Sequence, residues 1–325
     1  MNINWGILGT GKIAQKFAND FKYVNHGKIL AVASRDNEKA KNFSKRFGIE
    51  KAYDNYENLV NDKDIDAIYI SSPHHTHCEN AILCLNNKKA VLCEKPIAVN
   101  EKQLSLMIDA AKKNDTFLME AMWTYFLPSI LKVKDWLSKG LIGDVEFIMA
   151  DFGFQAEYDS KSRLFNPEFA GGALLDVGIY PIALSLLVME QMPEQIISNA
   201  KIGNTGIDES NAIILKFNKG QIAQLSSSLV VELKNEAYIF GTKGNIHMPN
   251  FWSSKKAFLN VKNKSPEVFE NNYPAIGLNF ETQEVIDLLL QNKKESPRMP
   301  LNRSLQLMQI MDEIRKQINL KYPFE

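Results

Sequence analysis

A lysine that follows a short apolar run is the first side chain in this sequence that we consider for a chemical role. Residues 90–93 read Ala-Val-Leu-Cys, which is typical of a buried strand, and Glu94, Lys95 and Pro96 come next. Because a proline keeps the residue before it out of the helical region, the Lys95 ammonium is held at the strand exit. Ligands of open α/β sheets bind at such exits. An ordinary surface lysine is the alternative, which Lys95 taken alone does not exclude.

A glycine-rich turn near the start of the chain gives the second signal. An apolar run at residues 3–8 leads into Gly-Thr-Gly-Lys-Ile-Ala, the G-x-G-x-x-A form of the dinucleotide fingerprint. Gly9 permits the tight turn, Gly11 lets the backbone approach a pyrophosphate, and Ala14 lets helix and strand pack closely. The helix expected over about residues 11–21 then points its N-terminus at the phosphates. The motif predicts a dinucleotide site that includes Gly9, Thr10, Gly11, Lys12 and Ile13.

The end of the second expected strand, residues 30–33, bears on the choice between NAD and NADP. An NAD-selective fold places Asp or Glu there for the ribose 2′-hydroxyl, whereas this sequence has Ser34 and Arg35. A hydroxyl and a guanidinium suit a 2′-phosphate, so we expect NADP in preference to NAD. Asp36 is a competing ribose ligand, but we expect it to cap the helix that begins near Asn37.

Three histidines in four positions follow the strand expected at residues 65–70. The run from Ser71 to His77 suggests a metal at first, but the local pattern does not complete a zinc-binding motif. The run instead lies at another strand exit of the predicted nucleotide fold. We therefore expect helix capping and cofactor contacts here, and no metal. The cofactor contacts expected at these two later exits are Ser72, Pro73, His77, Glu94 and Lys95.

An apolar helix expected over residues 173–189 carries a further pair of chemical groups. Asp176 lies near its positively polarised N-terminus, and Tyr180 follows four residues later on the same face. Pro181 removes a backbone donor, so we expect a bend beside Tyr180. The run approaches membrane-spanning length, but its aspartate, proline and glycines indicate a buried helix. Without Lys95, a plain packing tyrosine would be the simpler interpretation.

The elements that position these residues form two regions. Strands and helices alternate to about residue 120, which is typical of a doubly wound parallel sheet, and a polar loop over residues 151–169 contains Arg163. Beyond residue 195, hairpin turns separate strands, and helices are expected at 278–291 and 304–318. We predict an α/β chain with a dinucleotide-binding Rossmann domain over residues 1–121. A substrate-binding and oligomerisation α+β domain, with a large open and mostly antiparallel sheet, covers residues 122–325. Its strands are expected at 196–202, 211–217, 221–229, 236–240, 245–248 and 257–261, after one at 145–152.

The bulk composition favours a small-molecule partner. The 325 residues include 38 basic and 38 acidic side chains, so no net charge indicates nucleic acid or an anionic membrane. Three cysteines without C-x-x-C spacing suit reduced thiols in a cytoplasmic protein. The first strand begins almost at the first residue, so we expect no secretory signal.

Together these motifs resemble the family of glucose-fructose oxidoreductase and inositol 2-dehydrogenase (Gfo/Idh/MocA) over nearly the whole chain. Within it, the sequence is most similar to the branch of NADP-dependent D-xylose dehydrogenase and dimeric dihydrodiol dehydrogenase. The resemblance implies a Rossmann domain followed by a domain with an open sheet, whose exposed face commonly packs against another subunit. The matching segments are Gly9–Ala14, Ala33–Arg35, Pro73 with His77, Cys93–Pro96, Met119–Thr124 and Gly171–Tyr180.

The resemblance also implies roles for single residues. Lys95 matches the lysine beside the nicotinamide, in a Lys95–Pro96 bond that we expect to be cis, and Asp176 matches an aspartate that touches substrate. Many members have histidine four residues after that aspartate, whereas this chain has Tyr180, as in the dihydrodiol and xylose branch. That change fits a phenol whose pKa of about 10 is lowered by a nearby ammonium. Trp123 would line the substrate pocket.

The combined interpretation is an NADP-dependent oxidoreductase that passes hydride between nicotinamide and a carbinol carbon of an aldose or a cyclic trans-diol. Tyr180 is the expected general base in oxidation, Lys95 polarises the oxygen, and Asp176 orients a neighbouring hydroxyl. A non-catalytic nucleotide-sensing regulator and an interaction protein that binds through its sheet are the alternatives. The later strands expose more apolar content than two helices cover, so we expect a homodimer or higher homo-oligomer through that sheet.

Overall fold

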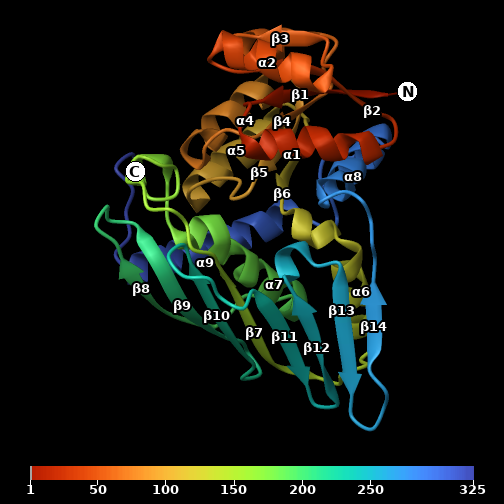
Figure 1. The fold of residues 1–325 in the computed structure, drawn as a ribbon, viewed down its shortest axis with the longest axis vertical. Helices are drawn as coiled ribbons and strands as arrows, with labels where there is room; N and C mark the ends of the chain where they lie inside the picture. Colours follow the sequence, from red (N-terminus) through yellow and green to blue (C-terminus); the bar gives the residue numbers. More distant parts are fainter. Residues whose placement is uncertain (1) are drawn as a thin grey trace. The chain divides into compact units, whose positions relative to one another are not determined.

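The computed structural model describes residues 2–325, which form two compact units (Figure 1). The first unit contains Met1–Trp123 and Pro274–Leu305, and the second contains Thr124–Tyr273 and Gln306–Glu325. The boundary predicted at residue 121 lies close to the first break between these units. The segment Pro274–Leu305, which the prediction places in the second domain, is part of the first unit.

The first unit is built on a parallel six-stranded sheet in the order β3-β2-β1-β4-β5-β6, which confirms the doubly wound fold. The strand order reverses between β1 and β4, so the ligand crevice of such a sheet is expected at their carboxyl ends. Gly9 follows β1 and Ser71 follows β4 at that point. The strands are β1 (Ile3–Leu8), β2 (Gly27–Ala33), β3 (Lys51–Tyr53), β4 (Ala67–Ile70), β5 (Ala90–Glu94) and β6 (Leu118–Ala121).

The helices of the first unit differ in how they begin, and some of them have a side-chain cap. Asp36 accepts a hydrogen bond from the backbone N–H of Lys39 at 3.1 Å, as predicted, and Asn100 accepts one from that of Gln103 at 2.9 Å. These helices are α1 (Lys12–Asp20), α2 (Asn37–Phe47), α3 (Tyr56–Asn61), α4 (His77–Asn86), α5 (Glu101–Lys113) and α8 (Leu278–Leu290).

Helix α8 is held on the first unit by a carboxylate from α1. The buried side chain of Asp20 accepts hydrogen bonds of 2.9–3.1 Å from the backbone N–H groups of Ile276, Gly277 and Leu278. It therefore satisfies the free donors at the start of α8, as a capping residue does, although more than 250 residues separate the two segments.

The second unit is built on an eight-stranded sheet in the order β14-β13-β12-β11-β7-β10-β9-β8. Every pair is antiparallel except β7 with β10, so the mostly antiparallel prediction is confirmed. The strands are β7 (Val145–Gly153), β8 (Gln195–Ile202), β9 (Asp208–Lys216), β10 (Ile222–Ser228), β11 (Glu236–Gly241), β12 (Gly244–Pro249), β13 (Lys256–Val261) and β14 (Glu267–Glu270).

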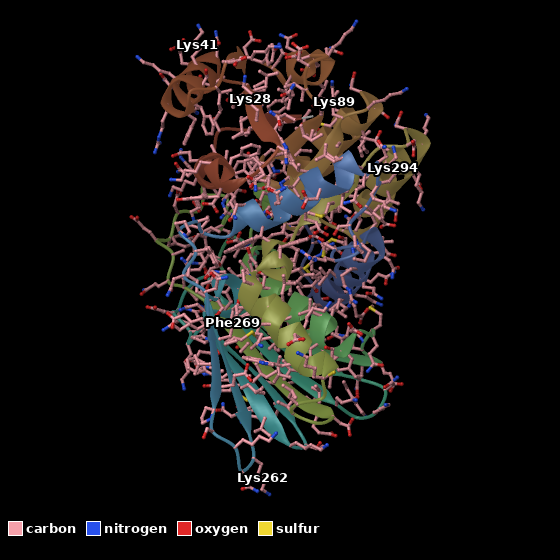
Figure 2. The ribbon with its side chains drawn as sticks, turned by 90° about the vertical axis from the view of Figure 1, so that its right-hand side faces the viewer. Lys28, Lys41, Lys89, Lys262, Phe269 and Lys294 are labelled. Atoms are coloured by element: carbon pink, nitrogen blue, oxygen red, sulfur yellow. The ribbon has the colours of Figure 1, made fainter. Side chains whose placement is uncertain are left out.

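One face of this sheet packs against helices. Helix α6 (Pro128–Ser138) contacts β13 and β14, and α7 (Ile179–Met189) contacts β7 and β10 (Figure 1). The last helix in chain order is α9 (Leu301–Gln317). The paired residues Ile148, Ile239 and Ile246 are fully buried on this covered face. In the side view of Figure 2, Lys262 marks the tip of the hairpin between β13 and β14.

The opposite face of the sheet carries a row of rings that no helix of the second unit covers. Neighbouring rings have centroids 4.3–6.5 Å apart across β7, β11, β12 and β13. On the same face, Met149 is 41% exposed and Ile197 is 54% exposed. We call this surface the open sheet face, and its ring row consists of Phe147, Phe240, Tyr238, His247 and Phe258.

The expected helix at residues 173–189 is present, with its irregularity ahead of Tyr180. A π-helical turn, Leu174–Gly178, precedes α7, because Pro181 has no N–H to offer the Val177 carbonyl. The stretch Pro167–Met189 is long and apolar enough to cross a membrane, with a mean hydropathy of 1.9. However, 89% of its most apolar 18-residue window is buried inside the described structure, as expected of a core helix.

Three carboxyl groups are buried close together in the first unit, on β5, β6 and α8. Glu281 of α8 is completely buried, and neither of its oxygens has a hydrogen-bond partner among the described residues. Burial raises the pKa of Glu281 well above its ordinary value, and the charges of Glu94 and Glu120 raise it further. The hydroxyl of Tyr69 donates a hydrogen bond to Glu94.

We expect Glu281→Gln to stabilise the protein increasingly as the pH rises. Because the folded-state pKa lies above the unfolded value of 4.5, wild type loses stability above that value, and the amide has no charge to bury. The advantage should grow by up to about 1.4 kcal/mol per pH unit until the folded pKa is reached. Urea unfolding at about pH 5.5 and about pH 8.5 measures it.

The exposed Glu57→Gln serves as the matched control and should show no such trend. Equal pH trends in the two variants would contradict the assignment of a neutral carboxyl group at position 281.

Candidate active site

The glycine turn after β1 leaves its backbone open to a ligand. Gly9 has φ +106°, and a Cβ at Gly9 would lie 2.9 Å from the Ser71 Oγ, so only glycine fits. A Cβ at Gly11 would meet no atom within 4 Å, and Gly11 directly precedes α1 without a side-chain cap. The backbone at Gly11 therefore has open space beside it at the start of α1, which fits the pyrophosphate of a dinucleotide.

The end of β2 presents a guanidinium where an NAD-selective fold has a carboxylate. Arg35 is exposed, while Ser34 is buried and accepts a hydrogen bond from the Asp36 N–H at 3.2 Å. Asp36 caps α2, as described above, so its carboxylate is not turned to a ribose. Burial raises the pKa of Tyr56, and the positive charge of Arg35 opposes that rise, so the two side chains are close neighbours. The sequence analysis did not identify Tyr56.

Buried side chains hold the turn that directly follows Lys95. The Lys95–Pro96 bond is cis, as predicted. The N–H of Ile97 donates to Glu120 at 3.0 Å, and the carbonyl of Pro96 lies 2.8 Å from Nδ1 of His77. Burial raises the pKa of Glu120 to about 7, while the Ile97 N–H and the charge of Lys95 lower it. The backbone that directly follows Lys95 is thus held by two buried side chains, Glu120 and His77.

His77 connects two strand exits of the first unit. Its ring is completely buried, with Nδ1 on the Pro96 carbonyl and Nε2 2.8 Å from the Ser72 carbonyl. Burial lowers the pKa of His77 to about 4, although both carbonyl contacts act in the opposite direction. We predicted a cofactor contact from His77, but the structure assigns its ring nitrogens to the backbone. Ser72 and Pro73, which are half-buried, remain the candidates from this run.

In the second unit, Asp176 lies on the π-helical turn and Tyr180 is the second residue of α7. Arg163, from the polar loop predicted over residues 151–169, donates a hydrogen bond from Nη1 to Asp176 Oδ1 at 2.8 Å. This ion pair keeps a positive charge at the aspartate. The sequence analysis named Arg163 only as a loop residue, because thirteen positions separate it from its partner.

An aromatic wall stands beside Tyr180. The rings of Phe152 and Trp252 stack with centroids 3.8 Å apart, and Phe152 lies 5.5 Å from the ring of Tyr180. Phe154 adds a third ring at 6.4 Å from Phe152. Such faces suit the carbon skeleton of a cyclic substrate. The sequence analysis identified only Trp123, which is half-buried at the end of the first unit's main segment.

The residues predicted to bind the cofactor or to act on the substrate are therefore divided between the two units. The glycine turn, Arg35, Ser72 and Lys95 belong to the first unit, while Asp176 and Tyr180 belong to the second. The first unit has the features of a nucleotide site, and the second has a carboxylate and a phenol near a wall of stacked rings.

Comparisons with known proteins agree with this division. Residues 3–122 match the oxidoreductase family with an NAD-binding Rossmann fold, and residues 130–247 match the GFO/IDH/MocA C-terminal domain. The chain is 38% identical to a trans-1,2-dihydrobenzene-1,2-diol dehydrogenase of Xenopus tropicalis, covering 99% of this chain and 100% of that protein. The human protein of the same name is 33% identical over 99% of both chains.

Two solved structures share the fold. A 3-ketoreductase from Actinomadura kijaniata, in complex with NADP and TDP-benzene, has a TM-score of 0.88 at 23% identity. An aldose-aldose oxidoreductase from Caulobacter crescentus has a TM-score of 0.89 at 20% identity. Each comparison covers 98% of both chains.

We expect Gly11→Ala to separate cofactor binding from folding. Its Cβ meets no protein atom and its φ of −69° suits alanine, so the melting temperature should stay within about 2 °C of wild type. The methyl group would stand where the pyrophosphate approaches, so NADP⁺ affinity should fall about tenfold or more. Differential scanning fluorimetry and a fluorescence titration measure the two effects.

Gly9→Ala is the contrasting variant, since it meets Ser71 and requires a φ that L-residues avoid. It should lower the melting temperature as well as the affinity. Unchanged NADP⁺ binding in Gly11→Ala would contradict the assigned pyrophosphate position.

Proposed function

Because the chain belongs to the Gfo/Idh/MocA oxidoreductase family and is an NAD(P)-dependent dehydrogenase of CH–OH groups, we propose that it uses NADP on a cyclic trans-diol or an aldose. The observation that carries the substrate proposal is the stacked Phe152–Trp252 wall beside Tyr180. An apolar wall next to an acid–base group suits a ring that carries hydroxyl groups on one side. The full-length relatives named for a dihydrobenzene diol support the same class.

NADP, when bound, accepts or delivers the hydride at the nicotinamide. The residues that would hold it are the Gly9–Gly11 turn, which fits the pyrophosphate, and Ser34 with Arg35, which suit a 2′-phosphate. Its presence in the 3-ketoreductase structure supports this choice of cofactor by analogy.

The chain's own residues handle the proton. In the oxidative direction Tyr180 takes the proton of the substrate hydroxyl as general base, and Lys95 polarises that oxygen and lowers the pKa of the phenol. Asp176 accepts a hydrogen bond from a neighbouring substrate hydroxyl and is held in orientation by Arg163 at 2.8 Å. The stacked rings exclude water from one side of the substrate.

Cofactor choice is expected to depend on Arg35. Arg35→Ala should weaken NADP⁺ binding by roughly 10- to 100-fold, because a charge-assisted contact to phosphate is worth roughly 1.5–3 kcal/mol. NAD⁺ binding should change little. The exposed Arg46→Ala, which removes a guanidinium paired with Gln15, is the matched control and should affect neither cofactor. Equal losses for NADP⁺ and NAD⁺ would show that Arg35 is only structural.

Tyr180 and Lys95 are expected to act as one unit. Tyr180→Phe should lower kcat by about 10²–10⁴ with little change in cofactor affinity, the usual effect of losing a positioned acid/base. Lys95→Met should cost at least as much, and the double variant should be little worse than the worse single one. Steady-state oxidation of a panel of cyclic trans-diols and aldoses, followed as NADPH absorbance, measures these effects.

The pH profile gives an independent test of this pair. In wild type, kcat/KM for oxidation should rise through an apparent pKa below the value of about 10 for free tyrosine, and Lys95→Met should move that limb upward. Tyr23→Phe, which alters an exposed tyrosine of the first unit, is the control. A fully active Tyr180→Phe would remove the mechanism proposed here. Cofactor binding without turnover of any substrate in the panel would favour the alternative of a nucleotide-sensing regulator.

We further propose that the protein is a homodimer through the open sheet face and acts in the cytoplasm. The ring row and the exposed Met149 form an apolar surface of the kind that pairs with a second copy. The three buried, unpaired cysteines suit a reducing compartment.

Light scattering at micromolar concentration should therefore give about twice the mass of the chain. Met149→Lys should shift the mass toward the monomer, because it places a charge in the apolar contact. Leu106→Lys, at a 50% exposed position on α5, should leave the mass unchanged. A monomeric wild type would refute the proposed dimer.

A further inference from the structure

A buried carboxylate from the sheet contacts the turn that carries Asp176. Asp208 opens β9, and its side chain is completely buried. Its Oδ2 accepts hydrogen bonds from the Leu174 N–H at 2.7 Å and from the Asn211 amide at 2.9 Å. Leu174 is the first residue of the π-helical turn, so Asp208 satisfies a donor at the start of that turn.

The same carboxylate accounts for a glycine just ahead of the turn. Gly172 has φ +125°, and a Cβ at this position would overlap Oδ1 of Asp208. That oxygen has no hydrogen-bond partner among the described residues. The absence of a side chain at Gly172 therefore lets the carboxylate lie directly against the backbone of the turn.

A second contact holds the far end of the turn. Asn211, which donates to Asp208, accepts a hydrogen bond from Ser227 Oγ at 2.9 Å. A Cβ at Gly178, the last residue of the turn, would lie 2.9 Å from that same Ser227 Oγ. Both ends of the turn thus rest on one hydrogen-bonded chain of side chains from β9 and β10.

We propose that Asp208 is a positioning residue for the dehydrogenase reaction, which fixes the π-helical turn on the sheet and thereby orients Asp176 and Tyr180. The inference rests on the proposed function for its kinetic consequences, whereas the hold on the turn is a property of the fold alone. Asp208 acts through Leu174 and Gly172. Misplacing an acid–base pair by a fraction of an ångström lowers the rate of the chemical step while cofactor binding in the first unit is unaffected.

The charge of Asp208 gives this role a pH dependence. Burial raises the pKa of Asp208 to about 7, and the bonds from Asn211 and Leu174 and the charge of Arg315 on α9 oppose that rise. Tyr322 is the other titratable neighbour, and its hydroxyl donates to the Gly171 carbonyl at 2.9 Å. As the pH falls through about 7, the carboxylate gains a proton and becomes a weaker acceptor for Leu174.

The test compares Asp208→Ala, Asp208→Asn and a stability control. Asp208→Ala leaves the Leu174 N–H buried without its partner, and kcat should fall about tenfold or more while the Kd for NADP⁺ changes by less than about twofold. Asp208→Asn keeps an acceptor of the same shape, so it should recover most of kcat and lose the limb of the kcat–pH profile near pH 7. Ile213→Val, a buried methyl deletion on the same strand, should lower stability without lowering kcat.

Hydrogen–deuterium exchange separates this inference from the proposed function. Peptides that span residues 171–180 should exchange faster in Asp208→Ala than in wild type and in Ile213→Val, whether or not any substrate is turned over. Unchanged exchange, or a kcat for Asp208→Ala within about twofold of wild type, would overturn the proposal. If Asp208→Ala does not fold, the Asn variant decides, because a retained limb near pH 7 would then refute the role of Asp208. A wild type inactive on every diol and aldose refutes the proposed function, and the exchange result still stands.

Discussion

The contacts of His77 with the carbonyl oxygens of Ser72 and Pro96 tie together the exits of β4 and β5, and the first unit's chemistry depends on them. Strand exits are where the hydrogen-bonded ladder of a sheet ends, so their backbone groups need other partners. The neutral imidazole has one N–H, which it donates to one of the two carbonyl groups, and its buried ring packs against the other, so a single side chain spans both exits. The Lys95 turn and the Ser72 turn are thereby placed by a single ring, and Glu120 secures the other side of the Lys95 turn.

The second unit uses the same physical device with a carboxylate. Asp208 and His77 are both completely buried polar side chains that bind backbone groups beside a chemical residue. Burying such groups costs free energy unless hydrogen bonds compensate, and the loss of one buried partner leaves the other unsatisfied. A turn held in this way has one strongly preferred position, which is what an acid–base group needs.

The local signals of the sequence were sufficient for most of this architecture. The cap at Asp36, the glycine turn and the long strands depend on neighbours within a few residues, and the structure confirms them. The unpredicted strands β3, β6 and β14 have three or four residues each, too few for a periodic pattern.

The missed features of the site are long-range contacts. Phe152 stacks on Trp252 across one hundred positions, and Asp20 caps α8 from the opposite end of the chain. His77 was assigned to the cofactor because its strand exit could be predicted, whereas the carbonyl groups on either side of its ring could not. Pro181 correctly indicated an irregular helix, but which turn would widen depended on tertiary contacts such as that of Asp208 with Leu174.

The division of roles between the units gives a physical reason why one fold serves different reactions. Cofactor binding depends on a glycine turn and backbone N–H groups, which constrain few side chains. In the proposed function, substrate recognition depends on side chains of the second unit, such as the stacked Phe152–Trp252 pair, which can change without disturbing the first unit. The 3-ketoreductase and the aldose-aldose oxidoreductase share this fold at TM-scores of 0.88 and 0.89 with only 23% and 20% identity. Substrate class must therefore be argued from the aromatic wall and the residues around Tyr180, since the Rossmann sheet carries information only about the cofactor.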